Sequence, residues 1–174
     1  MKGAETPRCS IVPLIDEAQI AGFKSSNNEL TAYLHEDALR DRSILLATTH
    51  LMVDETGLAI GYFSLLTDSI KVRVIGNYTE IEGIEYASIP ALKIGRLSCR
   101  MGYEGKGLGT EMIKVALSYL YEIIKYSGCR MMTVDSKKGC EGFYEHLGFK
   151  KTSNNRLHFT SMYLDISILL KEQA

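Results

Sequence analysis

Three glycines alternate with other residues in one short segment of the chain, at positions 105, 107 and 109. An apolar stretch that favours a β-strand (89–99) precedes this segment, and an amphipathic stretch that favours a helix (110–126) follows it. Glycine tolerates positive φ and close backbone approach, so the N–H groups of such a loop and of the helix N-terminus together form a cradle for an anion. The segment therefore predicts a loop that binds a pyrophosphate; a plain glycine-rich connection is the alternative.

Two common phosphate-binding patterns do not describe this loop. The Walker pattern, Gly-x-x-x-x-Gly-Lys followed by Ser or Thr, is absent from the sequence. The dinucleotide pattern Gly-x-Gly-x-x-Gly fits Gly105 and Gly107 but fails at Thr110, and the loop lies past the middle of the chain rather than after a first strand. Neither pattern therefore accounts for the loop.

The rest of the chain predicts a mixed α/β fold. Two apolar runs around a turn at residues 54–57 predict a β-hairpin, and a helix with N-cap residues at 25–28 is expected to run to about residue 41. Residues 68–88 predict a variable loop with some strand. Further elements are expected at residues 6–14 (a strand or an extended lead-in), 45–53 and 58–66 (the hairpin), 131–135 (strand), 142–147 (helix) and 157–168 (one or two strands).

Composition restricts the class of protein. A chain of 174 residues, 45% apolar and 24% charged, predicts one globular domain over residues 1–174. It has neither a signal peptide nor an apolar run of 18 residues, which argues against a membrane partner and favours the cytoplasm. The four cysteines form no Cys-x-x-Cys pair and the four histidines show no metal-ligand spacing, so no metal site is expected.

Charge is distributed unevenly along the sequence. The net charge is −1, which argues against a strongly basic nucleic-acid binder. Residues 1–90 nevertheless hold 7 basic against 13 acidic residues, whereas residues 91–174 hold 13 against 8. A basic C-terminal half suggests an anionic ligand there; the alternative is that the asymmetry averages out over the folded surface.

Two segments resemble motifs of the GNAT superfamily, N-acyltransferases that use acetyl-CoA. Residues 97–109 (LSCRMGYEGKGLG) resemble motif A, in which a strand leads into Arg/Gln-x-x-Gly-x-Gly/Ala; Glu104 stands where the family usually has Arg or Gln. Residues 140–149 (CEGFYEHLGF) resemble motif B and follow in the order and at the spacing that the family requires. The resemblance covers residues 89–150 and implies a central mixed sheet flanked by helices, with acetyl-CoA between two splayed strands.

A narrower resemblance, at residues 23–39, 61–65 and 89–97, is to a GNAT subgroup that includes toxins of toxin–antitoxin pairs. Such enzymes acetylate the amino acid carried on aminoacyl-tRNA. The resemblance thus implies aminoacyl-tRNA and an antitoxin protein as partners. Two alternatives remain open: an N-acetyltransferase of a small amine or protein N-terminus, and a non-catalytic acyl-CoA-binding regulatory module.

The GNAT resemblance also implies roles for individual residues. Tyr144 is the expected proton donor to the departing CoA thiolate, because an ordinary tyrosine is protonated at neutral pH. Phe143 is expected to pack, in part against the CoA. Cys99 stands where the family has a small apolar residue, so a nucleophilic role is not expected. The expected acetyl-CoA-binding residues are Leu97, Ser98, Cys99, Glu104, Gly105, Lys106, Gly107, Leu108, Gly109, Thr110 and Phe143.

No general base is evident in the sequence. Residues 89–99 contain no Asp, Glu or His, and Glu80, Glu82 and Glu85 lie in a stretch that favours a solvated acidic loop. Without a base the acceptor amine must be partly neutral by itself, which suits an α-amine of pKa about 7.7–8.0 better than a lysine of about 10.4. Candidate tRNA-phosphate contacts are Lys93, Arg96, Lys137, Lys138, Lys150, Lys151 and Arg156.

The C-terminal apolar run at 166–170 has two interpretations. It fits an interface in a homodimer, an assembly common in the family, and it fits a core strand equally well.

Overall fold

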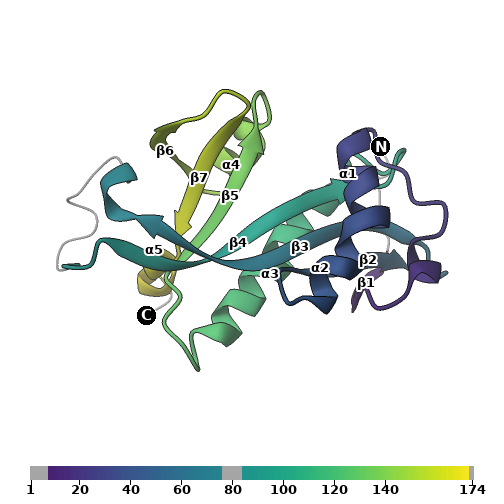
Figure 1. Ribbon diagram of the computed structural model, residues 1–174, viewed down its shortest axis with the longest axis horizontal. Coiled ribbons are helices and arrows are strands. Elements are labelled where there is room, and N and C mark those ends of the chain that lie inside the picture. Colours follow the sequence, from purple (N-terminus) through teal and green to yellow (C-terminus); the bar gives the residue numbers. More distant parts are fainter. Residues whose placement is uncertain (1–7, 76–83, 173–174) are drawn as a thin grey trace. The chain divides into compact units, whose positions relative to one another are not determined.

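The computed structural model describes residues 8–75 and 84–172 (Figure 1). The chain divides into two compact units. Unit 1 consists of Met1–Leu66 and Gly95–Ala116, and unit 2 of Thr67–Ile94 and Leu117–Ala174. The prediction that residues 1–174 make one catalytic domain stays a prediction.

The strands of unit 1 form an antiparallel meander. Strand β1 (Cys9–Pro13) pairs with β2 (Thr48–Asp54), and β2 pairs with the first part of β3 (Ala59–Lys71). The turn between β2 and β3 is closed by the Asp54 carboxylate, which accepts hydrogen bonds from the backbone N–H groups of Thr56 (2.9 Å) and Leu58 (3.1 Å). The hairpin predicted from the sequence is confirmed.

One helical segment of unit 1 contains a π-helical turn. It runs through α1 (Asn28–Ala32), the π-turn η2 (Tyr33–Asp37) and α2 (Ala38–Ser43). Asn27 caps it as the sequence predicts, its side chain accepting from the N–H of Glu29 at 2.9 Å. The segment's apolar face and the 3₁₀ turn η1 (Glu17–Ile20) contribute to a buried core of Leu14, Ile20, Phe23, Tyr33, Leu34, Ala38, Leu51, Ala59 and Tyr62.

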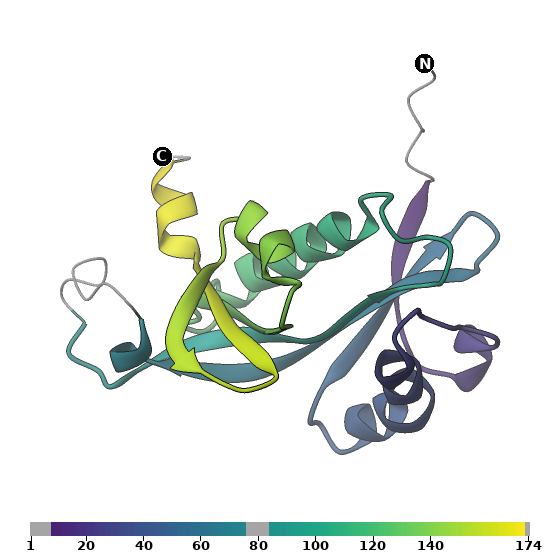
Figure 2. The same cartoon turned by 90° about the horizontal axis from the view of Figure 1, so that it is seen from above.

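Unit 2 is built on strands from the second half of the chain. Strand β5 (Met131–Lys137) pairs antiparallel with β7 (Phe159–Asp165), and β7 pairs with β6 (Lys150–Asn155). The helix α4 (Glu141–His146) follows β5, and α5 (Ile166–Glu172) continues directly from β7, as Figure 2 shows in yellow. The 3₁₀ turn η3 (Val72–Val74) adds to a core of Ile70, Val72, Ile75, Ile89, Ala91, Met131 and Tyr163.

Two elements have residues in both units. Strand β4 (Ser88–Cys99) pairs in parallel with β5 over Ala91–Ile94, within unit 2, and its last residues belong to unit 1. Helix α3 (Leu108–Ile123) begins in unit 1 and ends in unit 2. Hydrogen-bonded neighbours follow the order β1-β2-β3-β4-β5-β7-β6, a mixed seven-stranded sheet. The predicted mixed α/β fold is confirmed.

Several predicted boundaries need correction. Strand β3 continues to Lys71, into a stretch predicted to be mostly loop, because Ile70 is buried and secures its last residues. The C-terminal region forms β6, β7 and then a helix, so the strand interpretation of residues 166–170 is wrong. The Asp165 carboxylate accepts from the N–H of Ser167 at 3.0 Å and so caps the first turn of α5.

No helix within residues 8–75 and 84–172 is long and apolar enough to cross a membrane.

Candidate acetyl-CoA and acceptor sites

The glycine-rich loop of unit 1 joins the end of β4 to the start of α3. Gly102, Gly105 and Gly107 have φ of 85°, 70° and 79°. This left-handed region is costly for residues that carry a Cβ, which explains why glycine stands at these positions. Leu108 is buried at the first position of the sixteen-residue helix. The loop thus ends on the positive end of a helix dipole, as an anion cradle requires.

Backbone hydrogen bonds fix the start of this loop to the rest of unit 1. The N–H of Arg100 donates to the carbonyl of Ile60 (2.8 Å), and the N–H of Met101 donates to that of Lys24 (2.7 Å). The Arg100 side chain adds bonds from Nε to the carbonyl of Ala59 (2.6 Å) and from Nη1 to that of Gly22 (2.8 Å). The loop is therefore held in a defined conformation, which lowers the entropic cost of binding a ligand.

Glu104, the departure from the family pattern, turns back onto its own loop. Its carboxylate accepts from the N–H of Gly102 at 2.8 Å. Hydrogen bonds from its own backbone, from Gly102 and from Ser26 hold the pKa of the carboxyl below its usual value. The Glu104 carboxylate therefore places a fixed negative charge within the loop. The loop also holds a cation–π contact, since Lys106 Nζ lies 4.9 Å from the centre of the Tyr103 ring.

The end of β4 carries Leu97, Ser98 and Cys99. The buried Ser98 donates from Oγ to Ser25 Oγ at 2.8 Å, a bond that joins the strand to the loop before α1. Burial and the nearby Glu104 raise the pKa of the half-buried Cys99 thiol. A raised thiol pKa disfavours the thiolate, which agrees with the expectation that Cys99 is not a nucleophile.

In unit 2, helix α4 carries Phe143 and Tyr144. Glu141 fixes the start of this helix, since its carboxylate accepts from the N–H of Gly139 (2.7 Å) and from Thr160 Oγ1 (2.6 Å). Tyr144 is 8% exposed, and its ring meets Phe143 and Phe149 edge-on at centroid distances of 4.9 and 5.6 Å. Burial raises the pKa of Tyr144 to about 12, so its phenol stays protonated at neutral pH.

The hydroxyl of Tyr144 has no hydrogen-bond partner within the described part of the chain. The proton is therefore not shared with another protein group there, and the phenol keeps the capacity to donate to a ligand atom. Phe143, 37% exposed, is the more accessible of the two rings.

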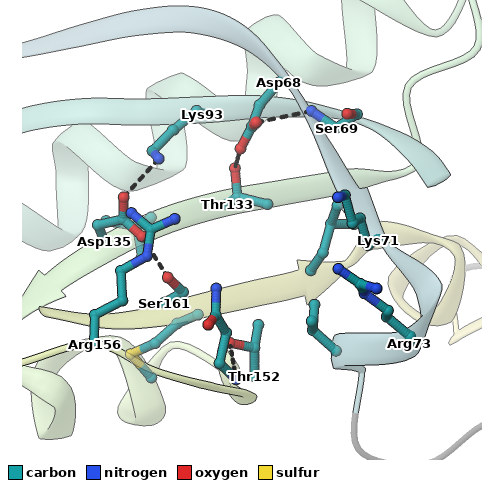
Figure 3. A pocket seen from close by; sticks show the side chains of 15 residues that line it. Asp68, Ser69, Lys71, Arg73, Lys93, Thr133, Asp135, Thr152, Arg156 and Ser161 are labelled. Atoms are coloured by element: carbon teal, nitrogen blue, oxygen red, sulfur yellow. Dashed lines mark hydrogen bonds and ion pairs between the residues drawn. The ribbon is translucent and has the colours of Figure 1, made fainter.

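Unit 2 also contains a polar cavity of about 310 Å³ (Figure 3). Lys93 Nζ donates to Asp135 Oδ2 at 2.7 Å, and Ser161 Oγ donates to Asp135 Oδ1 at 2.7 Å. Thr133 Oγ1 donates to Asp68 Oδ2 at 2.7 Å. Asp68 and Asp135 are not among the site residues expected from the sequence, although the position of Asp135 at the end of a predicted strand was a usable signal.

The predicted phosphate contacts are not equivalent in the structure. Lys93 is paired with Asp135, Lys151 is paired with Glu145 at 2.9 Å, and the Arg96 guanidinium lies over the Tyr33 ring. Arg156 lines the cavity of unit 2. The exposed Lys137, Lys138 and Lys150 lie outside that lining. Lys93 and Lys151 are therefore each neutralised by a carboxylate.

The glutamates and histidines that could act as a general base or bind a metal ion do not gather into a site in the described part of the chain. Glu85 is exposed, while Glu80 and Glu82 lie outside the described residues. His35 Nε2 is bonded to the carbonyl of Phe23 at 2.9 Å, and burial together with Arg42 lowers the pKa of His50. Across residues 8–75 and 84–172, no group of three His, Cys, Asp or Glu side chains is arranged to hold a metal ion.

Comparison with known proteins identifies the class to which this fold and loop belong. The family model for the acetyltransferase (GNAT) domain matches residues 16–165. The chain therefore belongs to the GNAT acetyltransferases, as its motifs predicted.

Particular members resemble it over their full length. A tRNA-acetylating toxin of Mycobacterium tuberculosis (strain ATCC 25618 / H37Rv) is 22% identical over 176 residues, covering 98% of this chain and 99% of the toxin. The solved structure of AtaT complexed with acetyl-methionyl-tRNAfMet matches with a TM-score of 0.84 and 16% identity, covering 96% of this chain and 100% of that one.

A further solved structure is a tyrosine-to-phenylalanine mutant of the AtaT toxin bound to the C-terminus of the antitoxin AtaR and acetyl-CoA. It matches with a TM-score of 0.73 and 16% identity, covering 95% of this chain and 99% of that one. At such identities the structural matches establish the fold.

Proposed function

We propose that this chain transfers the acetyl group of acetyl-CoA to the α-amine of an aminoacyl-tRNA and thereby arrests translation. The observation that carries the proposal is the end-to-end match to a tRNA-acetylating toxin, over 98% of this chain and 99% of that protein. The family model matches residues 16–165, and the match to the toxin extends beyond these bounds to 98% of this chain. Correspondence along both whole chains also supports a shared acceptor.

The loop of unit 1 has the chemistry to bind the pyrophosphate of acetyl-CoA, and Tyr144 of unit 2 has the chemistry to protonate its sulfur. Acetyl-CoA supplies the reactive acetyl thioester. The backbone N–H groups at residues 104–110, with the N-terminus of α3, bind the pyrophosphate. Backbone N–H groups at Leu97, Ser98 and Cys99 polarise the thioester carbonyl. As the N–C bond forms and the C–S bond breaks, the protonated Tyr144 phenol donates its proton to the CoA sulfur. The proton that the acceptor nitrogen loses returns through solvent to the Tyr144 phenolate.

The choice of an α-amine follows from the groups present in unit 2. Burial raises the pKa of Asp135, but hydrogen bonds from Lys93 and Ser161 and the charges of Lys93 and Arg156 outweigh it, leaving the pKa below its usual value. Such a carboxylate is a weak base near neutral pH. The weak basicity of Asp135 favours an acceptor that provides its own neutral nitrogen, and an α-amine with a pKa of about 7.7–8.0 does so.

An antitoxin and a cytoplasmic location complete the proposal. The solved complex of AtaT with the C-terminus of AtaR supports an antitoxin partner for this chain. Acetyl-CoA and aminoacyl-tRNA are both cytoplasmic, so the proposed reaction takes place there. A homodimer is part of the same proposal and is tested by the mass of the purified protein in solution.

The direct test is cell-free translation of a reporter with the purified protein, with and without acetyl-CoA. We expect arrest that requires acetyl-CoA, together with transfer of radiolabelled acetyl from acetyl-CoA to the aminoacyl-tRNA pool. Tyr144→Phe removes the proton donor and should abolish both effects. Tyr126→Phe is a matched control, because Tyr126 is 88% exposed and lies away from α4 in sequence.

Two outcomes would contradict the proposal. Normal translation, at protein concentrations that still acetylate a small amine, would move the acceptor to a small molecule or a protein N-terminus. Acetyl-CoA binding with no transfer to any amine would instead favour a regulatory module. An unchanged rate in Tyr144→Phe would remove the proton-donor assignment alone.

A further inference from the structure

The polar cavity of unit 2 has the composition of a site for an anion that also carries hydroxyl groups. Its volume of about 310 Å³ lies at the lower end of the range for small-molecule sites. Eleven of its fifteen lining residues are polar or charged. These eleven are Asp68, Ser69, Lys71, Arg73, Lys93, Thr133, Asp135, Thr152, Asn154, Arg156 and Ser161.

Positive charge predominates in this lining. Four cationic side chains face two carboxylates. Lys93 is already paired with Asp135, and the Asp68 carboxylate accepts from Thr133 Oγ1. The cavity as a whole is therefore cationic, and it offers charge to a negatively charged ligand.

Three of the cations remain available to such a ligand. Lys71 and Arg73 have no ion-pair or hydrogen-bond partner within residues 8–75 and 84–172, and both are exposed. Arg156 forms no hydrogen bond with the described residues, although its positive charge helps to lower the pKa of Asp135. Figure 3 shows Arg73 and Arg156 on opposite sides of the cavity, each with its guanidinium turned inward.

Three different elements of unit 2 supply these cations. Lys71 is the last residue of β3, Arg73 lies in η3, and Arg156 follows the end of β6. Buried apolar neighbours hold the first two elements in place, since Ile70, Val72 and Ile75 belong to the core of the unit. Ser153 Oγ also donates to the Val74 carbonyl at 3.3 Å, which joins β6 to η3.

We propose that this cavity binds a phosphodiester of the acceptor RNA, with Lys71, Arg73 and Arg156 on the phosphate oxygens and the surrounding hydroxyl and amide groups on the ribose. This inference rests on the proposed function and adds the place at which the RNA is held. Guanidinium groups match phosphate oxygens in pairs, and serine, threonine and asparagine side chains bond to ribose hydroxyls.

The test compares two double variants of equal charge change. Lys71→Ala/Arg73→Ala removes two cations of the cavity whose side chains are exposed. Lys114→Ala/Lys125→Ala removes two exposed lysines of the α3 region, each ion-paired with a glutamate of its own segment. Each protein is assayed with aminoacyl-tRNA and with an amino acid methyl ester, an acceptor that has the α-amine and no phosphate.

The cavity variant should raise the KM for aminoacyl-tRNA by about tenfold or more, since each lost contact is a hydrogen bond to a charged group. Its kcat with the methyl ester should equal that of the wild type. The dependence of log KM on log salt should also become shallower by roughly 0.7 for each phosphate contact removed. The α3 variant should leave the KM for aminoacyl-tRNA and its salt dependence close to those of the wild type.

Several results would overturn the inference. An unchanged KM for aminoacyl-tRNA in the cavity variant, with an active wild type, rejects the cavity while leaving the proposed function intact. An equal rise in KM for both double variants shows a diffuse charge effect. A third result is saturable AMP binding by the wild type that is lost in the cavity variant, while the KM of that variant for aminoacyl-tRNA is unchanged. It would assign the cavity to a free nucleotide. A wild type that acetylates no aminoacyl-tRNA rejects the proposed function and the inference together.

Discussion

Lys93 on β4 and Asp135 on β5 form an ion pair between neighbouring parallel strands, with Nζ 2.7 Å from Oδ2. Their side chains are 25% and 27% exposed. Water therefore screens the pair only in part, and its contribution to stability lies between that of a surface pair and that of a buried pair. The second carboxylate oxygen is held by Ser161, so the geometry of Asp135 is fixed on both sides.

Replacing Lys93 by methionine should lower the free energy of unfolding at pH 7 by about 1–2 kcal/mol. The folded-state pKa of Asp135 lies below its usual value, so its contribution is present above the unfolded pKa of about 3.9 and is lost as pH falls through the folded pKa. Urea denaturation at pH 7 and at low pH measures this difference, which should shrink in acid. Equal destabilisation at both pH values would show that packing of the lysine stem, and not its charge, is responsible.

Asp165 at the end of β7 should be more sensitive to replacement than Asp135. Its side chain is 6% exposed; it accepts from Arg130 Nη2 at 2.7 Å and from Nε at 3.0 Å, and it caps α5. Asp165→Ala leaves a partly buried guanidinium without its partner and should cost about 3–5 kcal/mol in urea denaturation at pH 7. Asp165→Asn, which keeps the shape of the side chain and the cap acceptor, should cost less.

Asp165 also predicts a loss of stability in acid. Burial raises its pKa, but hydrogen bonds from Arg130 and Ser167 outweigh the burial, so the net pKa is lowered. Stability from this pair is therefore present above the unfolded pKa and is lost as the pH falls through the folded pKa. The unfolding free energy of the wild type should therefore fall more between pH 5 and pH 2 than that of Asp165→Asn. An equal fall in both proteins would contradict this account.

The raised pKa of Tyr144 predicts the shape of the pH–rate profile. With a pKa of about 12, Tyr144 remains a proton donor throughout the range in which the enzyme is assayed. The value of kcat/KM should therefore rise with pH as the acceptor α-amine loses its proton, around pH 7.7–8.0 by its ordinary pKa, and then stay level to about pH 9.5. Methyl ester acetylation measured from pH 6 to 9.5 tests this.

A descending limb below pH 9.5 would show that the donor has an ordinary or lowered pKa, and would exclude Tyr144 in its buried state. In Tyr144→Phe, kcat should fall by about 10²–10⁴ with the rising limb unchanged, because that limb belongs to the substrate. The control Tyr126→Phe should give the wild-type profile.

Much of the fold could be predicted because local patterns and turn chemistry agree. The Asp54 turn, the Asn27 cap and the strand–glycine loop–helix segment all appear at the expected positions. Each depends on short-range hydrogen bonds or on backbone conformations that only a few residue types adopt. The π-turn of residues 33–37 has no such signature, since the apolar spacing of an α-helix continues through it.

The cavity of unit 2 could not be predicted for a different reason. It is lined by residues of β3, η3, β4, β5 and the β6–β7 region, most of which are far apart in the sequence. Strand β6, with the sequence KKTSNN, lacks the alternation of apolar and polar residues that identifies a strand. Strand β3 continues through the polar residues 67–69 before it reaches its last apolar residue, Ile70. Pairing with neighbouring strands, not local preference, defines both segments.

Gly107 provides the sharpest test of the anion cradle. Its φ of 79° means that Gly107→Ala adds backbone strain of about 1–2 kcal/mol, although a Cβ there meets no atom within 4 Å. If the loop relieves this strain by moving, the affinity for acetyl-CoA should fall on the order of tenfold. Isothermal titration with acetyl-CoA measures the affinity, and thermal denaturation measures the strain.

Gly128→Ala is the matched control, because Gly128 also has open space around a Cβ but lacks a positive φ. It should leave acetyl-CoA affinity unchanged and stability unchanged or slightly raised. Gly107→Ala could instead keep the wild-type affinity while its midpoint of unfolding falls. That result would show that the strain exists but that the loop conformation at residue 107 does not determine pyrophosphate binding. Loss of affinity in both variants would point to a general loosening of the fold, since only one of the two changes lies in the loop.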